Sequence, residues 1–414
     1  MRQIIYIFLL ISIASCVSNE DRQGKPVNMY GGPGRHNAFE YADFYRELIY
    51  VETPDEFKND NGINEETGAV VPPLTLTGDD VIIATDDGRL VKVAFEHLLW
   101  EAQLDSGEVA ASAMCADPGH NIYLISNKGS LYSFLPHGEL RWKKMIFPDP
   151  GQYEIFSDLL ALNDGIYAAS SEGRLKKIDF DGNIKWERES SFGITEVFAA
   201  DDKGNLIINY TQNKFGVNDS LIYMDSNGHV IWARQLDMIR LIKTPVYRHG
   251  TIYVSGLIEI GERRLSSVIA FDTEGNEKWK IELNIVPRFL AVNDKQELFV
   301  SGYNAGIGQA MSGIFKFDTA GSLDWKMYYD AAIPSPPVID QSSLAFPAST
   351  PEGIVMLFVR QSDGTISKDF TMTEYPAFNL QPSVSDHGII VFAATGELTL
   401  LRFYQPPFNR YIPW

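Results

Sequence analysis

The residues of this sequence that could do chemistry lie mostly beside glycine. The stretch DFDGN (179–183) has the D-x-D-G spacing of a calcium-binding loop, but it lacks a third ligand and a distal glutamate at the required spacing. Five of the seven histidines adjoin a glycine, and no two lie close enough in sequence to suggest a zinc-ligand pair. These five are His120, His137, His229, His249 and His387. Tight turns use Asp, Asn and Gly, so we interpret these sites as turns and expect no metal.

Catalytic motifs are missing from the sequence as well. There is no G-x-S-x-G elbow, no Walker loop and no zincin motif, and the acidic residues are too many and too scattered to nominate a catalytic pair. Of the two cysteines, Cys16 and Cys115, the second has no free partner if the first is acylated, which predicts a buried, inert thiol. We predict no catalytic residue and no cofactor.

The N-terminus reads as an export and anchoring signal. Arg2 precedes an apolar run that is too short to span a bilayer as a helix. The stretch IASC (13–16) resembles the lipobox of bacterial lipoproteins, which implies cleavage before Cys16 and its acylation; an ordinary secretory signal is the alternative. We assign residues 1–15 to a lipoprotein signal peptide and 16–43 to a lipidated tether and lead-in segment. Val17 follows the cysteine, with no aspartate to retain the protein in the inner membrane, so the analogy implies the outer membrane.

Composition narrows the classes of partner. The formal net charge of −19 repels phosphate backbones, so we expect no nucleic-acid binding. A hydrophobic content of 45% is ample for a packed core.

The chain contains an internal repeat. Successive tryptophans from Trp100 lie 42, 44, 46, 47 and 46 residues apart, and from the second onward each follows a glycine by four residues. They are Trp100, Trp142, Trp186, Trp232, Trp279 and Trp325. The next step reaches Gly364, but Lys368 stands at the tryptophan position.

A second set of segments repeats at the same spacing and predicts the fold. Strand–glycine–strand segments begin at 81, 122, 166, 206, 252, 298, 344 and 389, which makes eight units. Each unit reads as four strands, the first often containing a proline, which is acceptable on an edge strand. We predict an all-β, eight-bladed propeller of four-stranded blades over residues 44–403, followed by a Pro- and aromatic-rich tail at 404–414. The strand at 47–54, with Tyr50 at the tryptophan position, is predicted to close the ring by completing the last blade.

The glycine turn followed by D-x-x-G-x-x-x-W resembles the PQQ-type propeller repeat, and MYGGPGRHNAF (29–39) resembles that family's lead-in segment. The resemblance implies that the tryptophans, and Tyr50, dock each blade against its neighbour. It also raises a quinone-dependent dehydrogenase as a remote alternative. Such enzymes have adjacent cysteines and long lid insertions, which this chain lacks.

A lipid-anchored propeller with this repeat is similar to the BamB family of outer-membrane β-barrel assembly lipoproteins. The resemblance implies a non-catalytic, periplasm-facing scaffold that binds the barrel subunit of that machinery. Ile239 and Arg240, shortly before Pro245, resemble the family's partner-binding pair. Longer insertions at 210–220, 256–267, 302–313 and 347–355 are expected to lie in one sector of one face. The alternative is a general periplasmic or surface propeller that binds a glycan or another envelope protein.

Overall fold

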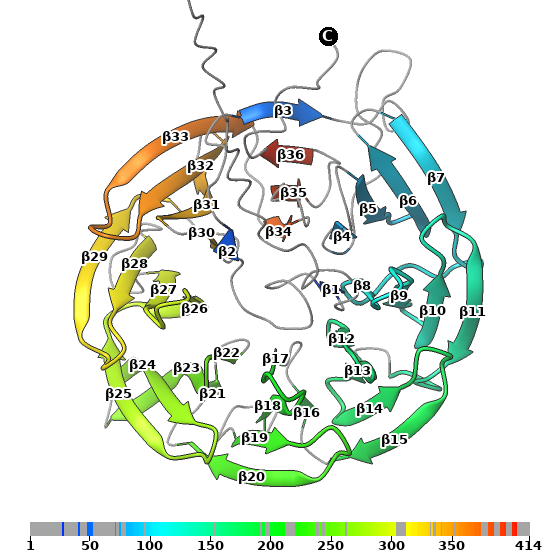
Figure 1. Ribbon diagram of the computed structural model, residues 1–414, viewed down its shortest axis with the longest axis horizontal. Helices are drawn as coiled ribbons and strands as arrows, with labels where there is room; N and C mark the ends of the chain where they lie inside the picture. The colour runs from blue at the N-terminus through cyan, green and yellow to red at the C-terminus, as the bar shows by residue number, and fades with distance from the viewer. Residues whose placement is uncertain are drawn as a thin grey trace, which may run out of the picture.

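The computed structural model describes residues 27–28, 40–41, 48–52, 71, 74–75, 80–94, 97–151, 154–190, 193–194, 199–211, 220–236, 240–241, 245–260, 263–303, 312–331, 333, 337–340, 342–350, 353–373, 380–384, 390–394 and 400–403. The strands form sheets, antiparallel apart from the pairing of β2 with β30, that are arranged in a ring with the first strand of each sheet nearest the centre (Figure 1). The predicted all-β propeller of mostly four-stranded antiparallel sheets is confirmed. Within the described part of the chain, no helix is long and apolar enough to cross a membrane.

The sheets follow one another in chain order. The first contains β4 (Leu74–Thr75), β5 (Asp80–Ala84), β6 (Arg89–Ala94) and β7 (His97–Gln103). The next contains β8 (Cys115–Ala116), β9 (Ile122–Ile125), β10 (Ser130–Phe134) and β11 (Leu140–Met145), with β1 (Val27–Asn28) on its inner edge. Then come β12 (Leu160–Leu162), β13 (Gly165–Ala169), β14 (Arg174–Ile178) and β15 (Ile184–Glu189). The following sheet holds β16 (Gly193–Ile194), β17 (Ala199–Ala200), β18 (Leu206–Thr211), β19 (Ser220–Met224) and β20 (Val230–Gln235).

The second half of the ring continues the pattern. One sheet holds β21 (Arg240–Leu241), β22 (Val246–Arg248), β23 (Thr251–Ile260), β24 (Arg263–Asp272) and β25 (Glu277–Leu283). Its neighbour holds β26 (Val286–Val292), β27 (Leu298–Tyr303), β28 (Ser312–Phe317) and β29 (Leu323–Tyr329). Next are β30 (Val338–Asp340), β31 (Ser343–Thr350), β32 (Gly353–Arg360) and β33 (Ile366–Thr373), joined by β2 (Glu40–Tyr41). The last described sheet is β34 (Leu380–Val384), β35 (Ile390–Ala394), β36 (Leu400–Phe403) and β3 (Leu48–Glu52), in which Tyr50 pairs with Arg402.

The core lies between sheets rather than inside any one of them. Each hydrophobic cluster combines side chains from two neighbouring sheets, as when Leu90 of β6 and Leu124 of β9 share one cluster. Both faces of a sheet are therefore covered, and β13 is buried at every position. Strands buried on both faces read as continuous apolar runs instead of alternating ones. The outermost strand β15 is exposed except at Trp186, which is half-buried.

The ring has two distinct faces. On one, the turn face, the first strand of each sheet turns into the second and the third into the fourth. On the other, the hairpin face, the second strand turns into the third, and the chain crosses to the next sheet. Turn-face turns use a carboxylate to hold the loop: Asp179 Oδ1 accepts hydrogen bonds from the backbone N–H groups of Asp181 and Asn183, at 3.1 and 2.7 Å. Gly182 completes this turn at φ +80°, a conformation that favours glycine.

Candidate functional site

The structure places the residues with metal or catalytic potential in turns and in the core. The described residues include no group of three or more His, Cys, Asp or Glu side chains that could hold a metal ion. His137 lies 3.4 Å from Glu139 and His229 lies 3.1 Å from Asp225, each within its own turn. His120 and His249 have positive φ in two other turns, whereas His387 and Cys16 lie outside the described residues.

Cys115 is fully buried between two sheets. Burial and, to a smaller extent, the charge of Asp117 raise the pKa of the Cys115 thiol well above its ordinary value. The thiolate is the reactive species, so this cysteine stays protonated and unreactive at neutral pH.

The tryptophans of the repeat contact the next sheet along the chain. In five of the six, indole Nε1 donates a hydrogen bond to the carbonyl of a turn-face turn in that sheet. The pairs are Trp100 with Pro136 (3.1 Å), Trp186 with Ser226 (2.9 Å), Trp232 with Thr273 (2.9 Å), Trp279 with Thr319 (3.0 Å) and Trp325 with Gln361 (2.8 Å). The ring also lies against the glycine of the same turn, where a Cβ atom would come within 2.6–3.1 Å of it.

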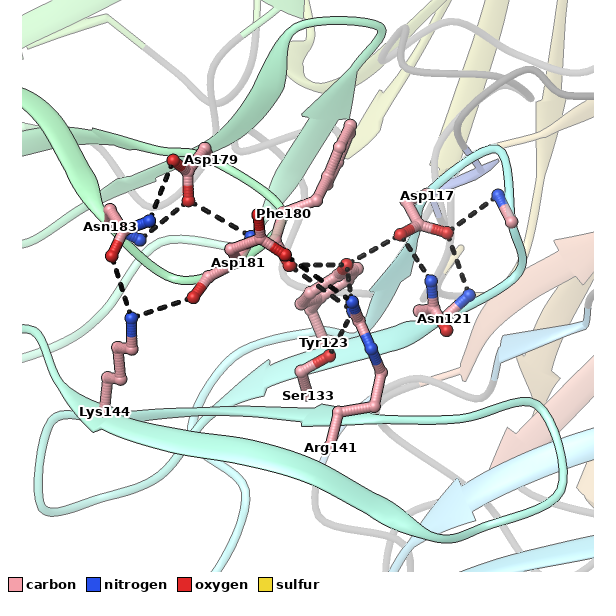
Figure 2. Close-up of polar contacts among 11 residues, drawn as sticks. Asp117, Asn121, Tyr123, Ser133, Arg141, Lys144, Asp179, Phe180, Asp181 and Asn183 are labelled. Atoms are coloured by element: carbon pink, nitrogen blue, oxygen red, sulfur yellow. Dashed lines mark hydrogen bonds and ion pairs between the residues drawn. The ribbon is translucent and has the colours of Figure 1, made fainter.

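Trp142 is the exception. At this junction Arg141, shown in Figure 2, makes the hydrogen bond that the indole makes at the other junctions. Its buried Nε1 has no hydrogen-bond partner. The expected acceptor, the carbonyl of Phe180, instead accepts a hydrogen bond of 3.3 Å from Arg141 Nη1. The ring atoms of Trp142 nearest to Gly182 are the outer atoms Cζ3 and Cη2, whereas at the other five turns Cδ2 is among the nearest. The indole of Trp142 is therefore displaced relative to its turn. Arg141 therefore links these two sheets in place of the indole N–H.

Arg141 belongs to a polar chain that crosses the junction (Figure 2). Its Nη1 also donates to Tyr123 Oη and Ser133 Oγ, both at 3.0 Å. Tyr123 Oη donates in turn to Asp117 Oδ2 at 2.7 Å. Burial, followed by the hydrogen bond and charge of Asp117, raises the pKa of the Tyr123 phenol, which stays protonated. We interpret this chain as structural, because every member is satisfied by another part of the protein.

This difference predicts unequal effects of one substitution at two sites. Trp232→Phe removes a hydrogen bond and leaves the Thr273 carbonyl without its indole donor, whereas Trp142→Phe removes an N–H that is already unpaired. We expect Trp232→Phe to lower the free energy of unfolding by about 1 kcal/mol more than Trp142→Phe does. Urea unfolding of the two variants measures the difference. Equal losses would show that the Arg141 contact does not replace the indole hydrogen bond.

A buried ion pair on the hairpin face makes stability depend on pH. Glu154, 2% exposed at its side chain, accepts hydrogen bonds from Arg174 Nε at 3.0 Å and from the Gly151 N–H at 3.3 Å. Burial acts to raise the pKa of Glu154, but the hydrogen bonds and charge of Arg174 outweigh it, and the pKa lies below its usual value of 4.5. A carboxyl with a depressed native pKa stabilises the fold above its unfolded pKa, and this contribution is lost as pH falls through the native pKa.

We therefore expect the free energy of unfolding to fall below pH ~4.5. Glu154→Gln should destabilise the protein at pH 7 but flatten the fall between pH 5 and about pH 3. Urea midpoints measured across this range for both proteins provide the test. A Gln variant with the full wild-type pH slope would exclude Glu154 as one of the responsible groups.

The long insertions lie at equivalent positions in neighbouring sheets. All four fall between the second and third strands: β18 and β19, β23 and β24, β27 and β28, and β31 and β32. The strands that flank them belong to sheets that are consecutive around the ring, so the ends of these strands share one sector of the hairpin face (Figure 1). We call this the hairpin sector.

Arg240 joins this sector through backbone pairing. In β21 it lies opposite Leu257 of β23, and Leu241 lies opposite Gly256. The same hairpin extends to Ile260, which pairs with Arg263. The structure thus brings together two features that the sequence places about twenty residues apart, Arg240 and the 256–267 insertion. Ile239 lies outside the described residues.

Comparisons with known proteins agree with this fold. Residues 62–234 match the family model described as outer membrane protein assembly factor BamB. No curated protein matches the chain in sequence. The fold is similar to that of BamB from Moraxella catarrhalis, with a TM-score of 0.62 and 15% identity over 87% of this chain and 99% of that one.

Two further solved structures are similar to this chain at comparable TM-scores. The computationally designed Ika8 protein gives a TM-score of 0.60 and 11% identity over 82% of this chain and 96% of that one. The Dos1 propeller gives a TM-score of 0.60 and 13% identity over 81% of this chain and 93% of that one. At these identities the likeness is one of fold. Residues 62–234 thus carry PQQ-type repeats of the BamB type, and the chain is a repeat β-propeller similar in structure to BamB at low sequence identity.

Proposed function

We propose that this protein is a non-catalytic, lipid-anchored scaffold of the bacterial envelope, with a BamB-like role in outer-membrane β-barrel assembly. The observation behind the proposal is the match of residues 62–234 to the BamB family model. The lipobox-like stretch before Cys16 supports the anchor and a periplasm-facing location at the outer membrane. The lack of a catalytic motif in the sequence supports a binding role, which needs no cofactor.

We further propose that the ring has eight blades and is closed by its own N-terminal strand. Eight repeat units in the sequence support the number. The pairing of β3 with β36, in which Leu48 lies opposite Phe403 and Glu52 opposite Leu400, supports closure of the last blade by this strand. In a closed ring, no sheet edge is left open between the first and last blades to pair with other chains.

The hairpin sector is the proposed partner site. Rigid strand pairing positions Arg240 beside the 256–267 hairpin, and Arg263 and Arg264 begin the returning strand. Arg240, Arg263 and Arg264 outnumber the two glutamates of this hairpin, Glu259 and Glu262, so three positive and two negative charges leave a net charge of +1 in a chain of formal net charge −19. This local excess of positive charge favours an acidic partner surface. Longer turns on a rigid scaffold are where recognition residues concentrate. The proposed partner is the barrel subunit of the assembly machinery.

Crosslinking in native envelopes tests the partner. The full lipoprotein is captured after mild crosslinking, and the recovered proteins are identified by mass spectrometry. We expect the barrel subunit to be recovered with the wild-type protein. Arg240→Glu should reduce the amount recovered about tenfold, because the loss of a charged contact at the centre of an interface weakens binding by about 1.4 kcal/mol. Lys203→Glu makes the same charge change at an exposed position on the turn face and should leave recovery unchanged.

Other outcomes would redirect the proposal. Enrichment of a different envelope protein or of a glycan would favour a general binding propeller over an assembly factor. Full recovery of the barrel subunit with Arg240→Glu would move the contact away from the hairpin sector.

A further inference from the structure

Two short strands of the N-terminal segment lie inside the ring. β1 pairs with β8, with Val27 opposite Ala116 and Asn28 opposite Cys115. β2 pairs with β30, with Glu40 opposite Ile339 and Tyr41 opposite Asp340. Both β8 and β30 are first strands, so their outer edges face the centre of the ring, and Figure 1 shows β1 and β2 on the central side of their sheets. The N-terminal segment therefore covers two inner strand edges.

The directions of these pairings show at which face of the ring each N-terminal strand begins. β8 runs toward the turn face, where the Asp117–Asn121 turn begins. β1 is antiparallel to β8, so it starts at the turn face and runs toward the hairpin face. β2 is parallel to β30, which also runs toward the turn face, so β2 returns to that face. Finally β3, antiparallel to β36, starts at the turn face on the outer rim. The directions of β1, β2 and β3 are consistent with a single path of the N-terminal segment: β1 begins at the turn face, β2 returns to it, and β3 starts from it.

This path orients the ring relative to the N-terminus. We propose that the N-terminal segment holds the ring with its turn face toward the lipid surface and with its hairpin face, including Arg240, pointing away from it. The orientation rests on the proposed lipid anchor at Cys16, whereas the docking of β1 does not. The eleven residues from Cys16 to Val27 reach at most about 40 Å when fully extended. What distinguishes the two faces is the direction of β1, which begins at the turn face, so the chain that leads back to the anchor leaves the ring from that face.

The orientation matters for function because it leaves the hairpin sector unobstructed. A partner that approaches from the periplasm meets Arg240 and the 256–267 hairpin without competing with the membrane. The acidic turns of the opposite face stay hydrated, since the tether allows a gap wider than the Debye length of about 8 Å at physiological salt.

Docking of β1 can be tested with the native thiol. Residues directly opposite in an antiparallel pair have Cα atoms about 4.5–5.5 Å apart, within the range for a disulfide. The Asn28→Cys lipoprotein is refolded from urea in the presence of oxidised glutathione, so that the Cys115 thiol can react before folding buries it. The introduced thiol and the Cys115 thiol should then form a disulfide, releasing two molecules of reduced glutathione, and peptide mapping should recover the linked peptides. Asn28→Cys in a Cys115→Ala background is the matched control and should give no such link. Absence of the link in the first variant would overturn the docking of β1 and the orientation with it.

Energy transfer to lipid tests the orientation itself. Single cysteines replace Asp181 on the turn face or Glu172 on the hairpin face of the same sheet, both exposed, and each is labelled with a donor dye. Cys115 stays unlabelled because it is fully buried. The labelled lipoproteins are inserted into phosphatidylethanolamine–phosphatidylglycerol vesicles that contain a headgroup-labelled acceptor. We expect higher transfer from the Asp181→Cys position, because a five-residue strand separates the two faces by about 17 Å.

The results separate this inference from the proposed function. Equal or reversed transfer in vesicles that carry the protein would overturn the orientation and leave the anchor intact. Failure of the unlabelled lipoprotein to float with the vesicles would reject both the anchor and the orientation, while a disulfide between the Asn28→Cys thiol and Cys115 would still support β1 docking.

Discussion

Replacing Gly129 with alanine should lower the free energy of unfolding by about 3–5 kcal/mol, one of the largest effects expected of a single methyl group in this fold. Gly129 has φ +79°, where an L-residue costs about 1–2 kcal/mol. A Cβ at this position would also come within 2.1 Å of the Phe147 carbonyl oxygen, which belongs to the backbone. Relieving that overlap displaces the segment whose Ile146 and Phe147 N–H groups donate to the Gly129 carbonyl, at 3.1 and 3.0 Å.

Gly250 provides the matched control for Gly129. Its φ of +80° is almost the same, but nothing lies within 4 Å of a Cβ built on it. Gly250→Ala should therefore cost only the backbone term, about 1–2 kcal/mol. Urea unfolding of both variants separates the close approach from the backbone conformation, because only the first differs between them. A loss at Gly129 no larger than the loss at Gly250 would contradict the close approach to the Phe147 carbonyl.

The repeat made the fold predictable from sequence. Gly138, Gly182, Gly228, Gly275 and Gly321 repeat in register with the tryptophans that follow them, and each adopts positive φ in a turn-face turn. The eight predicted second strands all begin within one residue of the strands observed, from β5 to β35. Local turn chemistry and burial on both faces determine these features, so they are visible in a single sequence.

Other features depend on pairing between distant segments and were not predictable. β1 and β2 are two residues long and have no periodicity, so nothing in residues 27–41 indicates which inner edges they cover. The unpaired indole of Trp142 follows from Arg141, whose guanidinium reaches a carbonyl 39 residues away. At the candidate site, the sequence indicated Arg240 and the 256–267 insertion separately, and only the pairing of β21 with β23 brings them together.

Trp232→Ala should destabilise the protein by about 3 kcal/mol, near the lower end for loss of a large aromatic side chain because this indole is only half-buried. The ring stacks on Tyr223 with centroids 5.3 Å apart and donates to the Thr273 carbonyl in the next sheet. Its removal opens a gap on both sides of one junction. Ile231→Ala, at a neighbouring side chain that is 52% exposed, is the control and should change stability by less than about 0.5 kcal/mol.

Hydrogen exchange shows where the Trp232→Ala loss falls. In a ring of repeats, stability is approximately a sum of unit terms and interface terms between neighbours. Loss of Trp232 should therefore speed exchange at the Gly275 and Asn276 amides, which donate to Asp272 in the turn beside the indole. The equivalent turn at Gly321, beside Trp279, should keep its protection. Faster exchange at every turn would mean that the ring opens as a single unit. Exchange confined to one junction would explain how the repeat tolerates Lys368 at a tryptophan position, because weakening one interface leaves the others unchanged.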